Sequence, residues 1–393
     1  MWYGIVIIYG SPHSGLVNSF GEPWEQLRRF TLKQLRNFGF GKSSMETLIM
    51  DEVTEFIDGL EASNGKSIDN IQHRFSVAVV NALWTIVSGA RYSHHDPKLS
   101  HLTSQVTKSF DATTNTGGLI LFAPWVKHIL PGLSGYTFIR KVMDELREFM
   151  IKTVETHKLT YASDNCPRDF IDVFLREISV TQDPTSSFYK DVGGKYFVGF
   201  DTTSKTLSWA LLYLTKYPEA QEKLQNEIQR ATENQRAVAL TDRPNMPYTQ
   251  SLIEEVLRLS SLLPVGVPHR VLWDTKFCGI FLPKDTNLFV NIYFIHHNPE
   301  IWGDPENFRP ERFLSNDGQV FKKNENLMPF FVGKRECLGQ SLARDTIFLF
   351  LTNIFQNWNI MLDPAAPEAS LEPAPGFNVN PQSYSIVANK RHP

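Results

Sequence analysis

The chain has few cysteines and no long apolar run, and these two shortages exclude several classes of protein. Only three of its 393 residues are cysteine: Cys166, Cys278 and Cys337. Three cysteines cannot all pair and their spacings match no metal knuckle, so free thiols in a reducing compartment are expected. The longest apolar runs, 5–9 and 117–126, are far shorter than the roughly 20 residues that cross a bilayer. We therefore expect no signal peptide and no transmembrane segment in this chain.

An excess of either charge is missing too. The net charge is −3 and the isoelectric point is about 6.4, whereas a nucleic-acid surface would need a strong basic excess. The composition instead offers 42% hydrophobic residues, including 28 Phe, enough for an apolar interior around a flat cofactor. The length alone suggests two or three domains. Because no linker appears, we predict a single domain over residues 1–393.

Helical periodicity dominates the chain, and the strand-like pieces are short and late, so we predict a mainly α fold with small β sheets. A buried helix is expected over 68–89, where Gly89 closes it, and another helix is expected to begin at Pro218. The strand-like segments are 274–283, 286–293 and a terminal hairpin over 376–390 around Asn380-Pro381.

The most informative stretch is 330–339, which reads F-F-V-G-K-R-E-C-L-G. Cys337 is predicted to lie at the start of a helix, where the helix dipole favours a thiolate. Gly333 and Gly339 let the backbone pass close to a flat ring, and Arg335 can pair with an anionic group. A lone cysteine at such a place is usually an ordinary buried residue, but the pattern F-x-x-G-x-R-x-C-x-G is far more specific.

This stretch resembles the haem-binding loop of cytochrome P450 enzymes, and the resemblance extends over most of the chain. It implies haem b (iron protoporphyrin IX) with the Cys337 thiolate as the axial ligand of the metal. Trp24 and Arg28 match the family's W-x-x-x-R helix, and His269 matches a further propionate donor of the microsomal branch. The haem contacts implied are Cys337, Arg335, Trp24, Arg28, His269, Phe330, Gly333 and Gly339.

Glu255 and Arg258 are three residues apart and share one helical face with apolar residues, so we predict a buried pair. A buried pair with unused donors is costly, and a third partner is therefore expected. The family resemblance implies that Arg312, within 308–313, completes a structural triad with these two residues.

The segment 198–203 resembles the element that activates dioxygen in this family. Gly199 leaves room for dioxygen, and Asp201 and Thr202 form the acid–alcohol pair that delivers protons. These three are the predicted catalytic residues. By the same resemblance, the substrate pocket is lined by Val198, Phe200, Val265 and Phe377.

The resemblance implies a monooxygenase that inserts one atom of O2 into an apolar substrate of xenobiotic, steroid or fatty-acid type. Electrons are expected from NADPH through cytochrome P450 reductase, with cytochrome b5 as a second candidate donor. Arg36, Lys42 and Lys334 are the candidate basic patch for an acidic partner. The family implies an intracellular place on the cytosolic face of the endoplasmic reticulum. The family's N-terminal anchor and its early strands and helices have no counterpart here, and residues 1–14 are atypical.

Three other functions stay open at this point: a non-catalytic or decayed haem-protein fragment, a haem-thiolate isomerase or dehydratase, and a plain helical scaffold. The pairs His94-His95 and His296-His297 do not predict a metal site, because side chains that are adjacent in sequence point apart.

Overall fold

The computed structural model describes residues 15–40, 43–115, 125–161, 166–189, 201–374 and 378–391. The chain divides into two compact units. Unit 1 contains Met1–Met45, Asn81–Gly199 and His269–Leu288, and unit 2 contains Glu46–Val80, Phe200–Pro268 and Phe289–Pro393. Within the part of the chain described here, no helix combines the length and the apolar character needed to cross a membrane.

Unit 1 is mostly helical. Its helices are α2 (Gly15–Asn18), α3 (Glu22–Asn37), α6 (Pro97–Asn115), α8 (Val126–Ile129), α9 (Tyr136–Thr160) and α10 (Phe170–Val180). The helix α5 (Ile71–Ser88) begins in unit 2 and ends in unit 1, with Gly89 at φ +64° just after it, as the sequence predicts. Glycine suits that place because a left-handed residue is needed to close the helix.

An aromatic cluster joins α3 to α10. Phe30 on α3 is buried, and its ring contacts the rings of Phe170 and Phe174 on α10 edge to face, with centroids 6.1 and 5.9 Å apart. Phe188 lies 4.8 Å from Phe30, also between ring centroids. Edge-to-face pairs of this kind stabilise by about 1 kcal/mol each beyond the apolar area that they bury. The cluster therefore fixes α3, which carries two of the predicted haem contacts, against the rest of unit 1.

The strands of unit 1 correct one prediction. The segment 274–283 was expected to be a single strand, but it forms the hairpin β2 (Thr275–Phe277) and β3 (Ile280–Leu282). The chain turns at Cys278 and Gly279, whose φ values are +48° and +79°. Two positive φ values in a two-residue loop match the twist of antiparallel strands. The next strand, β4 (Asn287–Leu288), pairs with β1 (His269–Arg270).

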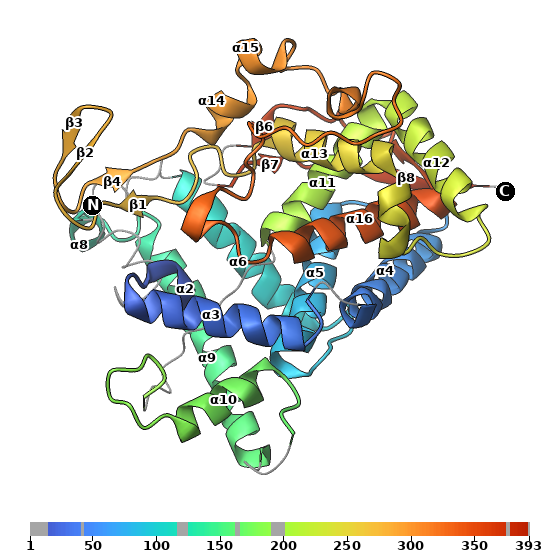
Figure 1. Cartoon of the computed structure of the whole chain (residues 1–393). Helices are drawn as coiled ribbons and strands as arrows, with labels where there is room; N and C mark the ends of the chain where they lie inside the picture. The colour runs from blue at the N-terminus through green and yellow to red at the C-terminus, as the bar shows by residue number, and fades with distance from the viewer. Residues whose placement is uncertain are drawn as a thin grey trace. The chain divides into compact units, whose positions relative to one another are not determined.

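Unit 2 is built around a buried helix, α16 (Gln340–Asn357). Figure 1 shows it beside α11 (Asp201–Lys216) and α13 (Pro247–Ser260), and it also contacts α12 (Pro218–Thr232). Residues 345–356 of α16 are buried on every side. The predicted helix start at Pro218 is confirmed. The remaining helices are α4 (Ser43–Ser63, most of it in unit 2), η1 (Leu240–Asn245), α14 (Ile292–His296), α15 (Pro299–Trp302), η2 (Pro310–Phe313) and η3 (Gly333–Arg335).

The terminal hairpin predicted over 376–390 is wrong. The strand β8 (Ile386–Lys390) pairs antiparallel with β5 (Trp358–Leu362), which follows α16 directly. Asn380 and Pro381 form β7 and pair with β6 (Pro373–Ala374). Ile386 also exchanges two backbone hydrogen bonds with Ile68, at 2.8 and 3.0 Å. The prediction failed because each strand has its partner outside the segment: β7 pairs with β6 just before it, and β8 pairs with the more distant β5.

Candidate functional site

The loop that carries Cys337 is closed by its own backbone. The N–H of Cys337 donates to the carbonyl oxygen of Phe330 at 2.8 Å, and a turn over Gly333–Glu336 lies between them. The helix α16 begins at Gln340, three residues later than predicted, after Gly339 as its N-cap. Because the side chain of Cys337 is exposed, the loop presents its sulfur outwards near the positive end of an 18-residue helix, where negative charge is stabilised.

The loop fits a flat cofactor in front of Cys337. A Cβ added to Gly333 or Gly339 would meet no heavy atom of the described residues within 4 Å. Gly333 also has φ +80°, a conformation that a side chain would strain. Phe330 and Arg335 are half-buried in the same loop. An exposed thiol beside open backbone is the donor that a haem iron takes as a thiolate ligand.

The back of the loop is held by unit 2. Phe331 has φ +61° and its ring lies against Gly266, in the turn after α13. A Cβ on Gly266 would overlap that ring, so glycine is required there for close packing as well as for its own φ of +60°. The guanidinium of Arg344 lies 5.0 Å from the ring centroid of Phe330 and pairs with Glu254. Burial, with the charge of Arg243, lowers the pKa of Arg344 to about 10.

The predicted triad residues come together in unit 2. Glu255 and Arg258 are fully buried on α13, and Arg258 donates to both carboxylate oxygens of Glu255 at 2.8 and 2.9 Å. Arg312 in η2 donates from Nε to Oε1 of Glu255 at 3.0 Å. The backbone N–H of Arg309 donates to the same oxygen at 2.9 Å. Bidentate geometry of this kind strengthens a charge-assisted hydrogen bond.

The other donors of the two arginines are also used. Arg258 donates from Nη1 to the carbonyl of His296 at 2.7 Å and from Nη2 to that of Pro305 at 2.8 Å. Arg312 donates from Nη2 to the carbonyl of Asp304 at 3.0 Å. A buried ion pair is tolerated when its further donors find partners in this way. The triad therefore ties α13 to the segment 296–313 and has no group left over for chemistry.

His296 links the triad to the segment that leads into the cysteine loop. The N–H of Met328 donates to Nε2 of the fully buried His296 at 3.1 Å, so the ring proton is on Nδ1, 3.0 Å from Oγ of Ser261. Ser261 in turn donates to the carbonyl of Arg258 at 2.7 Å. Burial, and to a smaller extent the charges of His297 and Arg258, lowers the pKa of His296 to about 3.

Two of the predicted catalytic residues begin α11. Asp201 is buried, and its Oδ2 is 2.7 Å from Nζ of Lys205 and accepts from Nδ2 of Asn378 at 3.0 Å. Thr202 is half-buried. Neighbouring residues of an α-helix point about 100° apart, so the Asp201 carboxyl and the Thr202 hydroxyl leave the helix in different directions. A proton passing between them would need an intervening water.

The predicted propionate contacts outside the cysteine loop lie in unit 1. Trp24 is buried on α3, and the guanidinium of Arg28 lies 5.7 Å from the centroid of its ring. His269 is exposed in β1. The next residue, Arg270, lies 4.5 Å from the ring centroid of Phe20, just before α3. This contact holds β1 next to the start of α3.

Part of the predicted site lies outside the described residues. Gly199, Val198, Phe200 and Phe377 fall there, and so does Lys42 of the basic patch. Val265, the remaining predicted pocket residue, is 40% exposed in the turn after α13.

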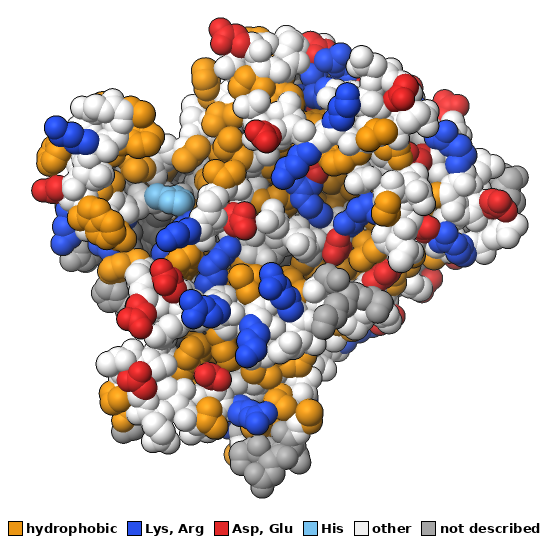
Figure 2. Space-filling model, viewed as in Figure 1, with side chains coloured by type: hydrophobic (Ala, Val, Ile, Leu, Met, Phe, Trp, Pro, Cys, Tyr) orange, Lys and Arg blue, Asp and Glu red, His pale blue; other side chains and the backbone are white. Residues whose placement is uncertain are grey.

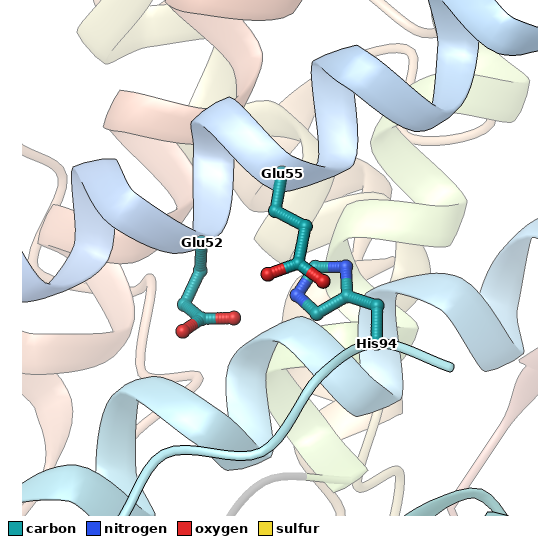
Figure 3. Close-up of side chains that lie close together, drawn as sticks. All are labelled: Glu52, Glu55 and His94. Carbon is teal, nitrogen blue, oxygen red and sulfur yellow. The ribbon is translucent and has the colours of Figure 1, made fainter. Parts of the chain in front are cut away.

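Two groups of His and carboxylate side chains, the kinds that bind metals, lie apart from the predicted haem site. Glu52 and Glu55 are three residues apart on α4, and Figure 3 draws them with His94, which belongs to the other unit. Carboxylates one turn apart are ordinary on helices and do not make a metal site. In unit 1, Nε2 of His157 lies 2.8 Å from Oδ2 of Asp169. That distance is a hydrogen bond, and the other ring nitrogen, Nδ1, lies 2.8 Å from the carbonyl oxygen of Thr153.

Sequence reasoning missed Lys205, Asn378 and the linking role of His296. An Asp–Lys pair at i,i+4 is a readable helix signal, so Lys205 could have been found beside Asp201. Asn378 and the partners of His296 come from distant parts of the chain and leave no local pattern.

Comparisons with known proteins identify the family of the chain. The family model described as Cytochrome P450 matches residues 6–388. The chain is 34% identical to Farnesoate epoxidase of Bombyx mori over 96% of its length and 76% of that protein's length. It is 37% identical to Cytochrome P450 2J2 of Homo sapiens, with 95% and 75% covered, and 38% identical to Cytochrome P450 2B4 of Oryctolagus cuniculus, with 95% and 76% covered. The chain therefore belongs to the cytochrome P450 family of haem-thiolate monooxygenases.

Proposed function

We propose that this monooxygenase inserts one oxygen atom of O2 into a small apolar organic substrate, using electrons that a reductase takes from NADPH. The observation that carries the proposal is the exposed thiol of Cys337 on a closed loop at the start of α16. Bound haem supplies the activation of dioxygen, and its chemistry belongs to the cofactor rather than to the protein. The protein binds the haem, orients it and delivers protons to the site of oxygen activation.

Cys337 would bind the haem iron as a thiolate and donate electron density to it. Arg335 in unit 2, and Trp24, Arg28 and His269 in unit 1, are the donors proposed for the propionates. Arg and Trp side chains suit that task because each presents N–H donors to a carboxylate. The haem ring would lie beside the loop, next to Phe330, Gly333 and Gly339.

Asp201 and Thr202 would hold and pass the protons that oxygen activation consumes, with Gly199 leaving room beside them. The carboxyl of Asp201 is already oriented by Lys205 and Asn378. The hydroxyl of Thr202 both donates and accepts, so it can relay a proton through water.

An apolar pocket would receive the substrate and exclude water, with Val198, Phe200, Val265 and Phe377 as its proposed lining. We propose a substrate of xenobiotic, steroid or fatty-acid type. The name of the Bombyx mori relative indicates that it epoxidises farnesoate, and farnesoate therefore belongs among the first compounds to be tested.

An acidic reductase is the proposed electron donor, with cytochrome b5 as a second donor, at the cytosolic face of the endoplasmic reticulum. Arg29, Lys33 and Arg36 are exposed on α3, where Figure 2 shows Lys and Arg side chains gathered, and Lys334 is exposed in the cysteine loop. Charge complementarity mainly accelerates association and weakens with salt. Reduction by the reductase should slow as ionic strength rises, and a salt-independent rate would contradict this partner.

The carbon-monoxide difference spectrum of the reduced, haem-loaded chain tests the central proposal. A strongly red-shifted Soret band is expected, because a thiolate ligand pushes electron density to the iron. A band at shorter wavelength would show a ligand other than thiolate and would overturn the proposal. Product formation from O2, NADPH and reductase then tests the reaction itself.

A further inference from the structure

The described part of α11 buries a lysine that the family resemblance does not account for. None of the Lys205 side chain is exposed. Burying an ammonium group without a counter-charge is very costly, so such a group has to be paired. Its counter-charge is the carboxylate of Asp201, with Nζ and Oδ2 2.7 Å apart. An acid four residues N-terminal to a base is also the favourable orientation for an ion pair on a helix.

Asp201 is fixed by more than this ion pair. Asn378, itself 4% exposed, donates from Nδ2 to the same carboxylate oxygen at 3.0 Å. The hydroxyl of Ser204 donates to the backbone carbonyl of Asp201 at 2.9 Å and lies 3.1 Å from the hydroxyl of Ser76, which donates to it. Both the side chain and the backbone of Asp201 are thus bonded to buried groups of unit 2.

We infer that Lys205 is a positioning residue that anchors the Asp201 carboxylate for proton delivery, an inference that rests on the function proposed above. Lys205 contributes through Asp201 and needs no contact with substrate or cofactor. Asp201 and Thr202 diverge along the helix, so a water that linked them would be held in place only while the carboxylate keeps one direction. The ion pair supplies that direction.

Loss of the anchor has a defined chemical consequence. Oxygenation uses one O2, two electrons and two protons to give hydroxylated product and one water. When protons arrive at the wrong time or place, the same electrons and protons leave with both oxygen atoms as H2O2. The measurable quantity is therefore the share of consumed NADPH that appears as product rather than as H2O2.

The first test compares Lys205→Met, which keeps an unbranched side chain but removes the charge, with Lys205→Arg, which keeps the charge. In Lys205→Met the product share should fall about tenfold, a part of the 10²–10⁴ that positioned proton transfer typically contributes. Lys205→Arg should recover most of it. Lys216→Met is the matched control, since Lys216 lies on the same helix but pairs with the exposed Glu368 at 3.1 Å. Lys216→Met should give the same product share as the unaltered enzyme.

Unchanged coupling in Lys205→Met, or no recovery in Lys205→Arg, would overturn the inference. Should Lys205→Met fail to fold, Lys205→Gln replaces it with the same two readings. If the wild-type chain lacked the red-shifted carbon-monoxide band, the proposed function itself would be wrong. Failure of the proposed function can therefore be distinguished from failure of the Lys205 inference.

A second test needs no turnover. Thermal unfolding of Asp201→Asn, Lys205→Met and the double variant forms a double-mutant cycle. Each single change leaves a buried charge or donor without its partner, so the double variant should lose less thermal stability than the two single losses added together. Additive losses would mean that the two groups do not interact and would overturn the anchoring contact.

Discussion

Around Glu255 the charged groups are buried and meet fixed protein partners, whereas around Cys337 the chain leaves its sulfur exposed. Both regions belong to unit 2 and both are anchored to long helices, α13 and α16. The triad is complete without any ligand. The cysteine loop is held from behind by the Phe330 carbonyl, by the contact of Phe331 with Gly266 and by Arg344 over the Phe330 ring.

The difference separates structural roles from functional ones. A buried charge cluster can do little chemistry once its donors are used, but it can fix the geometry of everything attached to it. An exposed thiol on a fixed loop is available for chemistry, and its removal should change the stability of the fold little. Substitutions in the two regions should therefore separate stability from activity.

The largest loss of stability is expected from Glu255→Gln. The change leaves Arg258 buried without its counter-charge and removes one of the two carboxylates that pair with Arg312. Breaking a buried pair costs about 3–5 kcal/mol of unfolding free energy. Urea unfolding of the haem-loaded protein measures it. Glu368→Gln is the control, because Glu368 is 89% exposed in its pair with Lys216 and surface pairs are worth about 0–1 kcal/mol. Similar losses in both variants would contradict the structural role.

Gly266→Ala should come next. The new Cβ would overlap the Phe331 ring, and the alanine would have to keep a positive φ. Overpacking and backbone strain together should therefore lower the free energy of unfolding by about 2–4 kcal/mol. Gly318→Ala is the matched control, since it has φ +72° but no heavy atom of the described residues near its Cβ. The same urea measurement serves both. Equal losses in the two variants would show that the ring contact does not hold the loop.

His296 predicts a pH dependence of smaller size. Its pKa is about 3 in the fold, against the ordinary histidine value of 6.5, so the unfolded chain binds the proton more readily. The stability that the neutral ring provides is present above about pH 6.5 and is lost as pH falls towards 3. In His296→Gln the loss over that window should be smaller, and the cost at neutral pH should be about 1–3 kcal/mol. Parallel stability–pH curves for the two proteins would refute this assignment.

Cys337→Ser should change stability least and activity most. The side chain is exposed, and exposed substitutions usually change the unfolding free energy by about 0.5 kcal/mol or less. The haem-free variant should therefore unfold like the unaltered chain. Its haem-loaded form should lack the red-shifted carbon-monoxide band and should not hydroxylate substrate. Hydroxylation that survives the change would remove Cys337 from the mechanism.

Helices could be predicted from the sequence where the signal is local. The Gly89 closure of α5 and the Pro218 start of α12 depend on residues within one turn of the helix end. The same holds for the one-face spacing of Glu255 and Arg258 on α13. The motif around Cys337 identifies the family because ten neighbouring residues carry it.

Long-range pairing could not be predicted. The strand β8 pairs with β5, which lies well before it in the chain. The partners of His296 come from two separate stretches, at the end of α13 and around Met328. The turn at Cys278 and Gly279 was missed because a Cys-Gly pair is an unusual hairpin signal, unlike Asn-Gly or Asp-Gly.

The bridge between Ile68 and Ile386 has a consequence for how the chain is made. Residue 386 is synthesised 318 residues after residue 68 (386 − 68). At about 5–20 residues per second, translation needs roughly 16–64 s to cover that interval. During this time the segment 46–80 has already been synthesised, but its partner strand β8 has not. Unit 2 can then form this bridge only after residue 386 has been synthesised, so its closure is a late step in making the chain.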